Sequence, residues 1–388
     1  MRITRLKVTP VNIPLEAPLL WSGGLYPGTS KLIIEIFTDQ GLVGLGEAPS
    51  VDVLATVQRM GELLEGMVPL DIAACEQRCL PPWQIVQNTD DASVAKAFGA
   101  IEIGLWDLRG KAWGQPLHLL LGGKVRDAVP FTEYFAFRGG RETGPEAVAE
   151  HCLAMREAHG STLFEGKLIQ GDPLLEIRTV RLLRQALGPE PTIRLDSNMQ
   201  WSLPTAIRIL REIEPYDVRN YEDPVATFEE MAALRRHSSI RFSSHVPDLR
   251  RAVALGTPDA IVVNFAVLGG IGRAIRFIGA CEAMGVDFWC YSGDTGVCTA
   301  AYLHVSAAMP WIREPSQSLF RWQVGDVIEG GPFRQKNDVV PVPDGPGLGV
   351  CLDHEALACW HRHFVDHGPL DHFHDPAAPG RMRRLPLR

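Results

Sequence analysis

Thr162-Leu-Phe-Glu-Gly-Lys167 is the first of four short apolar runs, each of which ends in a polar residue. The other three runs are Thr192-Ile-Arg-Leu-Asp196, Val218-Arg-Asn-Tyr-Glu222 and Ile240-Arg-Phe-Ser-Ser-His245. Amphipathic segments of helical length separate them, and the polar ends at 167, 196, 222 and 245 are spaced by 29, 26 and 23 positions. A (β/α)8 barrel uses roughly 30 residues for each strand and helix. The spacing therefore predicts four consecutive barrel strands whose polar ends share the C-terminal rim, where such barrels keep their active sites.

The alternation of strand and helix extends in both directions from this stretch. It begins with a strand-like run at 129–135 and continues to a helical segment that ends near Ala308. Alternation of this length predicts a parallel sheet with right-handed crossovers. An open dinucleotide-binding sheet is disfavoured, because Gly269-Gly-Ile-Gly272 only partly matches a glycine-rich phosphate loop and lies late in the chain. We therefore predict a closed, TIM-like α/β barrel over 129–325.

The region before the barrel follows a different pattern. Its strand-like runs are 2–8, 30–38 and 41–47. Helical periodicity follows them, which predicts an α+β unit over 1–128. Residues 15–29, between the first two strands, are rich in Pro and Gly and include Trp21. A segment of this length predicts either a functional flap or a disordered loop. Residues 326–388 remain as a C-terminal segment.

The composition excludes several classes of partner. The chain has 388 residues, is 46% hydrophobic and 22% charged, and carries a net charge of −8 without a large basic cluster. A nucleic-acid partner is therefore not expected. No apolar run approaches the roughly 20 residues of a membrane span, so no membrane partner is expected either. The eight cysteines contain no Cys-x-x-Cys pair and the N-terminus lacks a signal-peptide pattern, so we expect reduced thiols and a cytoplasmic location.

Asp196 and Glu222 are predicted to end neighbouring strands, where two carboxylates repel one another unless a cation lies between them. Carboxylate oxygens suit Mg²⁺, and we predict a magnesium site with Asp196, Glu222 and His245 as ligands. His245 is ambiguous, because a free imidazole could instead act as an acid. Candidates for supporting contacts or replacement ligands are Asn198, Asp223 and Asp248. The alternative is that the two acids cap the following helices or pair with arginines of the barrel.

Lys167 ends the strand before the predicted metal site. A divalent cation disfavours the ammonium form of a nearby lysine, which makes Lys167 a candidate base for the proton α to a metal-bound carboxylate. The cation would also stabilise the enediolate that remains. The alternative for Lys167 is a structural ion pair with Glu165 or Asp196.

Four motifs carry a resemblance to a known family: Glu165-Gly-Lys167, Asp196-Ser-Asn198, Glu222-Asp223-Pro224 and Asp344-Gly-Pro-Gly-Leu-Gly349. Together and in this order, they make the chain resemble the enolase superfamily, in its mandelate racemase and muconate lactonizing branch, over nearly its whole length. The non-acidic His245 at the third ligand position is most similar to the glucarate dehydratase-like group. The resemblance implies a (β/α)7β barrel and a cap formed by the N-terminal region and the C-terminal segment. It also implies Mg²⁺-assisted removal of a proton α to a carboxylate.

The chain departs from the family pattern at several positions. Glu165 replaces the first lysine of the Lys-x-Lys motif that often ends the second strand. Dehydratases of this group use a histidine on the seventh strand, supported by an aspartate on the sixth, and those positions here hold Tyr291 and Asn264. Tyr291 or Asp294 would have to replace the histidine as the catalytic acid. The alternative for Tyr291 is a packed aromatic residue at a strand end.

The resemblance also suggests how the substrate is held. The segment that contains Trp21 would fold over the barrel mouth and select the distal end of the substrate. The predicted substrate contacts are Trp21, Glu165, Asn198 and Asn264. An ordinary exposed loop is the alternative for this segment.

The site residues together with the resemblance imply a Mg²⁺-dependent acid-sugar dehydratase that acts on a small carboxylate and forms a keto-deoxy acid. A racemase, epimerase or cycloisomerase is the first alternative. A 1,1-proton transfer needs bases on both faces of the substrate, and the absence of His or Lys at the end of the seventh strand argues against it. The second alternative is a metal-binding homologue without catalysis, since the usual acid is missing. The family resemblance implies a homo-oligomer.

Overall fold

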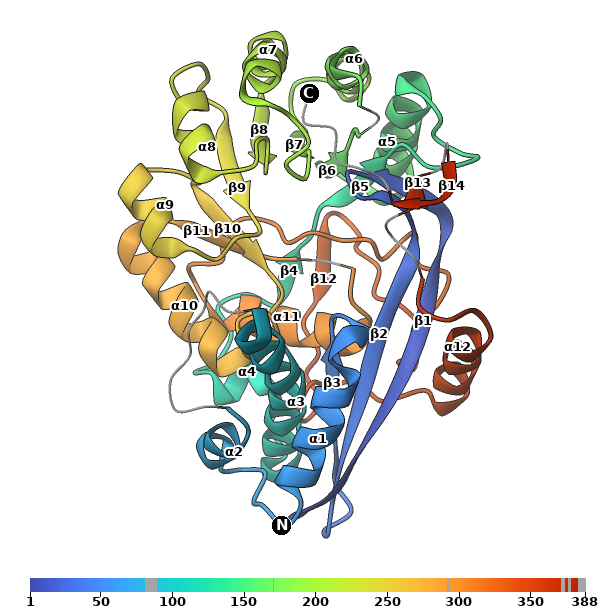
Figure 1. Ribbon diagram of the computed structural model, residues 1–388, viewed down its shortest axis with the longest axis vertical. Helices are drawn as coiled ribbons and strands as arrows, with labels where there is room; N and C mark the ends of the chain where they lie inside the picture. The colour runs from blue at the N-terminus through green and yellow to red at the C-terminus, as the bar shows by residue number, and fades with distance from the viewer. Residues whose placement is uncertain (81–88, 170, 292, 371–373, 376–377, 383–388) are drawn as a thin grey trace.

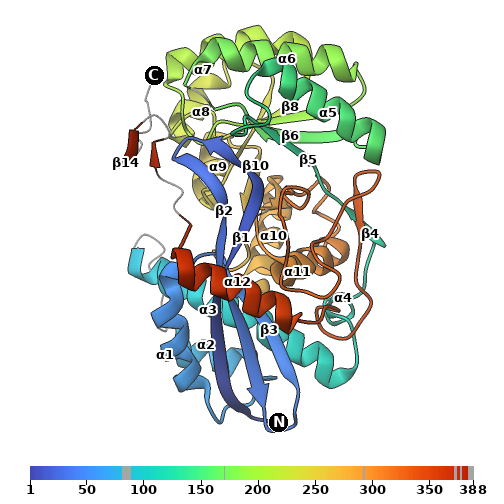
Figure 2. The same cartoon turned by 90° about the vertical axis from the view of Figure 1, so that its right-hand side faces the viewer.

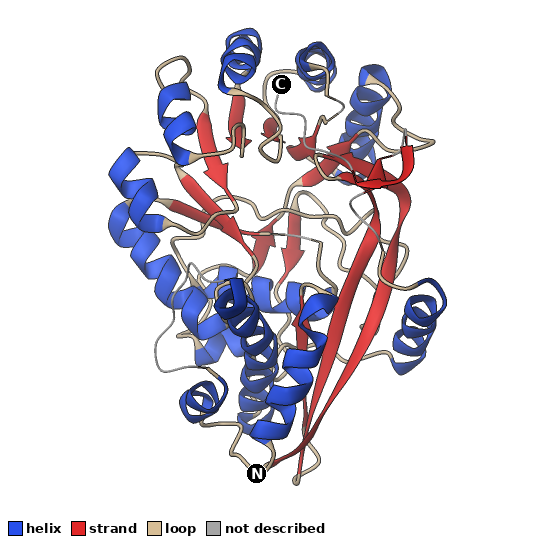
Figure 3. Cartoon of the chain, in the orientation of Figure 1, coloured by secondary structure: helices blue, strands red, loops and turns tan. Residues whose placement is uncertain are grey.

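The computed structural model describes residues 1–80, 89–169, 171–291, 293–370, 374–375 and 378–382 (Figure 1). Two parts can be distinguished, a barrel of short strands ringed by helices and a cap that combines long strands with helices (Figures 1 and 3). The N-terminus lies at the end of the cap that is remote from the barrel (Figure 1). Among the helices within the described ranges, none is long and apolar enough to cross a membrane.

Seven parallel strands form the barrel sheet, in the spatial order β11-β10-β9-β8-β7-β6-β5. The strands are β5 (Glu133–Ala136), β6 (Leu163–Lys167), β7 (Thr192–Asp196), β8 (Val218–Glu222), β9 (Arg241–Ser244), β10 (Ala260–Val263) and β11 (Asp287–Cys290). The helices are α5 (Pro145–His159), α6 (Pro173–Leu187), α7 (Leu203–Ile213), α8 (Phe228–Leu234), α9 (Leu249–Leu255), α10 (Ile271–Met284) and α11 (Gly296–Ala308). Neighbours in the sheet are neighbours in the sequence, so the predicted alternation is confirmed.

An extended segment around Ser316 closes the sheet between β11 and β5. Ser316 N–H donates to Pro130 O (3.0 Å), and Thr132 N–H donates to Ser316 O (2.9 Å). On the other side, Gln317 N–H donates to Cys290 O at the end of β11 (3.1 Å). The segment takes the place of an eighth strand, and the architecture is the (β/α)7β barrel that the resemblance implied.

The run predicted as the first barrel strand, 129–135, forms parts of two strands instead. β4 (Ala128–Pro130) pairs antiparallel with β12 (Val339–Pro341), whereas β5 pairs in parallel with β6. The chain changes partners between them, because Phe131 N–H donates to Asp338 O while Thr132 N–H donates to Ser316 O. Apolar patterning alone cannot reveal such a change of partner within one run.

The cap is an α+β unit, as predicted. Its antiparallel sheet has the order β1-β2-β3. The elements are β1 (Ile3–Trp21), β2 (Gly24–Thr38), β3 (Val43–Ala48), a 3-10 turn at Val51–Val53, α1 (Leu54–Leu64), α2 (Ile72–Cys79), α3 (Thr89–Trp113) and α4 (Leu117–Leu120). Gly44 allows α3 to pack closely on the sheet, because a Cβ there would lie 2.3 Å from Gly104 O. The apolar core of the cap lies between this sheet and its helices.

The prediction of a loop at 15–29 is wrong, because these residues form parts of two paired strands. β1 and β2 pair through this segment, with a register shift between Pro14 and Leu19, and the chain turns just after Trp21. Leu15 and Leu19 are buried at even spacing, which is the period of a strand. The register shift accommodates the prolines that suggested a loop. The paired strands rise from the cap to the barrel as one long hairpin (Figure 2).

The C-terminal segment returns to the cap. α12 (His354–His367) packs on β1 (Figure 2). The Asn12 side-chain amide donates to Gly368 O (2.8 Å) and Leu370 N–H donates to Ser30 Oγ (2.9 Å), so the chain after α12 is tied to β1 and β2. A short hairpin follows, with β13 (His374–Asp375) and β14 (Ala378–Met382). The boundaries placed at 128 and 325 stay predictions.

His304, in α11, is held neutral by its surroundings. Its Nε2 lies 3.1 Å from Leu348 O and must donate there, so its Nδ1 accepts from the backbone N–H (3.3 Å) and the Nδ1–H (3.1 Å) of His118. A proton added at Nδ1 of His304 would face two donors. Burial, with the contribution of His118, lowers the pKa of His304 from 6.5 to about 4.

We expect His304→Gln to reduce the acid sensitivity of the fold. Between pH 6.5 and 4 the unfolded chain binds a proton at this histidine that the folded chain rejects, so stability is lost as the pH falls through this window. The full effect on the free energy of unfolding is roughly 3 kcal/mol. Glutamine does not titrate, so the variant should not lose this stability. The effect is measured by comparing the thermal unfolding midpoints of the wild type and of His304→Gln near neutrality and at mildly acidic pH. The prediction would be contradicted if acidification lowered the thermal midpoint of the wild type and of His304→Gln by the same amount.

Candidate active site

Gly166 allows β6 to place two side chains inside the barrel. A Cβ at this position would lie 1.9 Å from Phe135 O, so only glycine fits where β6 passes β5. Side chains alternate along a strand, and Glu165 and Lys167 therefore share the inward face. Lys167 reaches the rim, and Glu165 lies one layer deeper and is fully buried.

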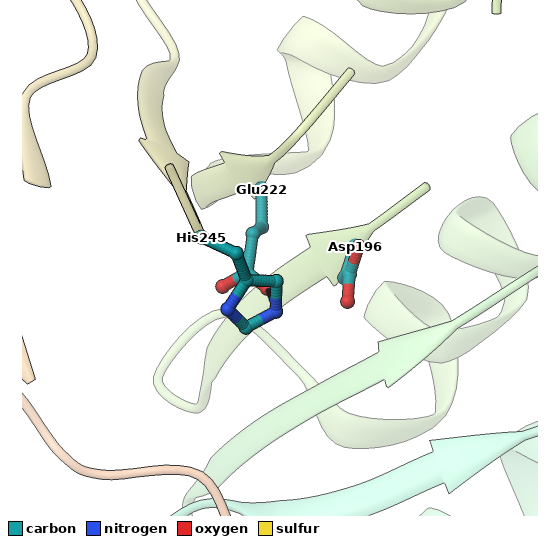
Figure 4. A group of neighbouring side chains, drawn as sticks. All are labelled: Asp196, Glu222 and His245. Carbon is teal, nitrogen blue, oxygen red and sulfur yellow. Dashed lines mark ion pairs between the residues drawn. The ribbon is translucent and has the colours of Figure 1, made fainter. Parts of the chain in front are cut away.

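Asp196, Glu222 and His245 come together at the rim, from the ends of β7 and β8 and from the residue after β9 (Figure 4). Their ligand atoms all lie within 4.8 Å of one another, and we call this group the carboxylate–histidine cluster. His245 Nδ1 lies 2.8 Å from Val262 O, and its Nε2 lies 2.7 Å from Glu222 Oε1. A histidine whose Nδ1–H donates to a backbone carbonyl presents the lone pair of Nε2 to a metal.

The side chains of Asn198, after β7, and of Gln317, in the closing segment, hold the two carboxylates of the cluster. Asn198 and Asp223 have φ values of 45° and 41°, in the left-handed region that Asn and Asp tolerate better than most residues. The Asn198 side-chain amide donates to both oxygens of Asp196 (2.9 and 3.0 Å). Gln317 Nε2 donates to Glu222 Oε2 (2.9 Å). These contacts orient both carboxylates toward His245.

The two other candidate ligands lie outside the cluster. Asp223 Oδ2 accepts from the backbone N–H of His245 (3.3 Å), which makes Asp223 a supporting residue. Asp248 accepts from the backbone N–H of Arg251 (3.1 Å) and caps the first turn of α9. The helix-cap alternative that the sequence left open for Asp196 and Glu222 does not hold, because Ser202 and Thr227 are the N-caps of α7 and α8.

The carboxylate–histidine cluster fits a divalent cation. Glu222 Oε1 is buried and lies 2.7 Å from His245 Nε2, so a proton or a cation must lie between these two acceptor atoms. Burial raises the pKa of Glu222. Burial would lower the pKa of His245, but the charges of Glu222 and nearby carboxylates outweigh it and raise that pKa. A divalent cation would replace the proton of the cluster and relieve the repulsion between Asp196 and Glu222.

Lys167 stands beside the cluster and pairs with Asp196 Oδ2. The ion pair with Asp196 that the sequence left as an alternative is therefore present. The lysine side chain is 14% exposed and lines the main cavity, so its ammonium group also faces the space where a ligand would lie. The position of Lys167 is compatible with a structural and with a catalytic role.

A cavity of about 630 Å³ lies over the cluster, where the barrel rim meets the cap. Its wall combines the strand ends of the barrel with the tip of the β1–β2 hairpin and the start of the segment after α12. The predicted site residues that line it are Trp21, Lys167, Asn198, His245, Asn264 and Tyr291. This volume is suited to a small molecule.

Glu165, predicted as a substrate contact, is not part of the cavity wall. It is fully buried, and its Oε2 accepts from Arg194 (2.5 Å) and Thr132 (3.2 Å). Its Oε1 accepts from Gln317 (2.9 Å). The prediction is corrected, because protein donors already occupy both oxygens of this carboxylate. Through Gln317, Glu165 helps to position Glu222.

Asp294, predicted as a catalytic group, lies behind the cavity wall. It is buried and accepts hydrogen bonds from Asn264 Nδ2 (2.8 Å), Tyr302 Oη (2.5 Å) and Lys31 Nζ (2.5 Å). Lys31 belongs to β2 and does line the cavity. Sequence reasoning missed it, because no spacing relates a cap strand to a barrel loop. The one available signal was a lysine within the apolar strand that continues Leu-Ile-Ile.

Comparison with protein families agrees with this geometry. The mandelate racemase/muconate lactonizing enzyme N-terminal domain matches residues 3–122, and the enolase C-terminal domain-like family matches residues 147–356. Together these matches span most of the chain.

Individual proteins are similar over nearly the whole chain. A probable glucarate dehydratase of Streptomyces coelicolor is 29% identical, covering 98% of this chain and 96% of that protein. A cis-3-hydroxy-L-proline dehydratase of Roseibium aggregatum is 30% identical, covering 90% and 96%. A crystal structure of an enolase from Pseudomonas fluorescens, with bound magnesium, potassium and tartrate, has a TM-score of 0.86 at 27% identity and covers 95% and 93%. The chain therefore belongs to the mandelate racemase and muconate lactonizing enzyme family of the enolase superfamily.

Proposed function

We propose that this protein is a Mg²⁺-dependent hydro-lyase that removes the proton α to a carboxylate and expels a β-hydroxyl group as water. Acid sugars are the first candidate substrates, because the motifs resemble the glucarate dehydratase-like group and two relatives are dehydratases. The observation that carries the proposal is the contact of Lys167 with Asp196 at the edge of the carboxylate–histidine cluster, beneath the cavity.

Each residue of the site has a role in this proposal. Asp196, Glu222 and His245 would hold the ion, which supplies the positive charge that stabilises an enediolate. Lys167 Nζ would accept the α-proton, since it faces the cavity beside the cluster. Asn198 keeps both oxygens of Asp196 in place. The tip of the hairpin lines the cavity and would limit the access of water to the reacting groups.

The upper wall of the cavity limits the distal end of the substrate. More than half of the lining residues are apolar or aromatic, among them Trp21, Leu319 and Leu370. Among the described residues, neither an arginine nor a carboxylate lines the wall. Lys31 and Lys96 of the cap also line the wall, but their ammonium groups already pair with Asp294 and Asp52. Along this described wall, a second carboxylate of a diacid would therefore find neither the paired donors of a guanidinium nor an unpaired ammonium group of the cap. We expect a monocarboxylate with few hydroxyl groups at its distal end to be preferred to an aldaric acid.

The test is a screen of the purified protein with Mg²⁺ against aldonic acids, aldaric acids, tartrate and short β-hydroxy acids. Mass spectrometry detects loss of water, and we expect it from a monocarboxylate. Exchange of the α-proton with deuterium but no loss of water would contradict the hydro-lyase and favour a racemase or epimerase. If no acid of the panel reacts although the protein still binds Mg²⁺, a homologue that binds metal without catalysis would be favoured.

A further inference from the structure

A second lysine enters the cavity from the cap. Lys31 lies in β2, and its side chain is 4% exposed. Its Nζ donates to Asp294 Oδ1 (2.5 Å) and to Pro49 O (3.1 Å). It lines the same cavity as Lys167. The described wall of this cavity thus carries lysines from both parts of the molecule, Lys167 from β6 of the barrel and, from the cap, Lys31 of β2 and Lys96 of α3.

Lys31 faces the side of the barrel opposite Lys167. Its partner Asp294 also holds Asn264, which follows the end of β10. With the segment around Ser316 as the eighth strand, β6 is the second strand and β10 the sixth. Strands that are four places apart in an eight-stranded barrel lie across its axis from one another. A ligand above the cluster would therefore lie between the two ammonium groups.

The surroundings of Lys31 favour its protonated, ammonium form. Burial by itself would lower the pKa of Lys31, but the charges of Asp294 and Glu47 and the nearby hydroxyl of Tyr26 outweigh it and raise that pKa above its ordinary value. Tyr291 stands on the same wall, because a Cβ on Gly293 would lie 3.1 Å from Tyr291 Oη and 3.6 Å from Tyr26 Oη. Burial raises the pKa of both phenols, so both remain protonated.

We propose that Lys31 is the proton donor to the leaving hydroxyl group, in the place of the histidine that the end of β11 lacks. This inference rests on the proposed hydro-lyase function. The neutral amine of Lys167 takes the proton of the Cα–H bond, and the electron pair of that bond forms the enediolate. The carboxylate then re-forms, the electron pair of the enediolate becomes the Cα=Cβ bond, the Cβ–O bond breaks with its electron pair on oxygen, and an N–H proton of Lys31 completes the water molecule. One proton lost from Lys167 to solvent and one gained by Lys31 restore both groups.

Replacement of Lys31 by methionine tests the proposal, because it separates the two proton transfers. The probe is the acid from the panel above that the wild-type protein dehydrates fastest. We expect Lys31→Met to keep α-proton exchange within a few-fold of wild type, since Lys167 is intact, while release of water falls by roughly 10²-fold or more. Lys111→Met is the matched control. Lys111 also pairs with a buried aspartate of the cap, Asp107 (2.6 Å), but it does not line the cavity, and both rates should be unchanged.

A merely structural role for Lys31 gives a different result. If the ion pair only fastens the cap to the barrel, exchange and release of water will fall together. The double variant Lys31→Met/Asp294→Asn removes the buried charge that the single variant leaves unpaired. We expect it to show the same split between the two rates with a thermal midpoint nearer that of the wild type. A parallel fall of both rates in the two variants, or unchanged release of water, would overturn the proposal.

The experiment also separates this inference from the proposed function. If the wild type exchanges the α-proton without releasing water, the hydro-lyase is wrong. Lys31 then has no leaving group to protonate, and the inference falls with the function. If the wild type and Lys31→Met release water at the same rate, the inference alone is wrong and the hydro-lyase stands. If the wild type is inert toward every acid of the panel, both proposals fall.

Discussion

Replacing Lys167 by methionine is expected to lower α-proton exchange and release of water together, by roughly 10²- to 10⁴-fold, the usual contribution of a positioned base. Both steps fall because elimination cannot begin until the α-proton is removed. Lys167 meets Asp196 at the edge of the carboxylate–histidine cluster and faces the cavity, so no rearrangement is needed for it to reach a ligand there. Incorporation of deuterium at Cα, followed by NMR, measures the first step directly.

Lys167→Arg provides the control for charge and packing. The guanidinium retains a cation beside Asp196, but it does not give up its proton in a protein and cannot act as a base. We expect this variant to keep the fold and the binding of Mg²⁺ while losing exchange. Exchange at a rate close to wild type in either variant would show that another group is the base.

Replacing Glu222 by glutamine is expected to abolish the stabilisation of the fold by Mg²⁺. An ion that binds only the folded chain raises its stability by roughly 2.7 kcal/mol at a concentration 100 times its Kd. Glu222 is fully buried, and glutamine would offer the ion one neutral amide oxygen in place of the two oxygens of a charged carboxylate. Thermal unfolding with and without Mg²⁺ measures the effect, and activity should be lost in parallel.

Glu229→Gln is the matched control for Glu222→Gln. Glu229 also pairs with a cationic side chain, that of Arg251, but the pair lies on the surface of α8 and α9. An exposed pair of this kind contributes little, so the shift produced by Mg²⁺ should match that of the wild type. An undiminished shift in Glu222→Gln would place the metal elsewhere in the molecule.

The barrel and its rim could be predicted because they follow from local periodicity. The polar residues at 167, 196, 222 and 245 recur at the length of one strand-and-helix unit, and the parallel sheet brings consecutive strand ends together. The meeting of Asp196, Glu222 and His245 within 4.8 Å follows from that topology. Strand periodicity was also present in Leu15 and Leu19, but the prolines between paired strands concealed it.

The parts that could not be predicted depend on contacts between distant segments. Lys31 and Asp294 are 263 positions apart, and only the docking of the cap on the barrel joins them. Glu165 belongs to a motif that suggested contact with substrate, yet the buried Arg194 on the neighbouring strand engages it. The depth of a side chain in the barrel depends on its position along the strand, and two positions separate Glu165 from Lys167 at the rim.

The most direct test of the account is α-proton exchange in deuterated solvent, followed by NMR, for the panel of acids with Mg²⁺ or with EDTA. We expect incorporation of deuterium at Cα of at least one acid with Mg²⁺, its loss with EDTA, and its absence in Lys167→Met. Exchange that persists in EDTA or in Lys167→Met would contradict metal-assisted removal of the proton by this lysine.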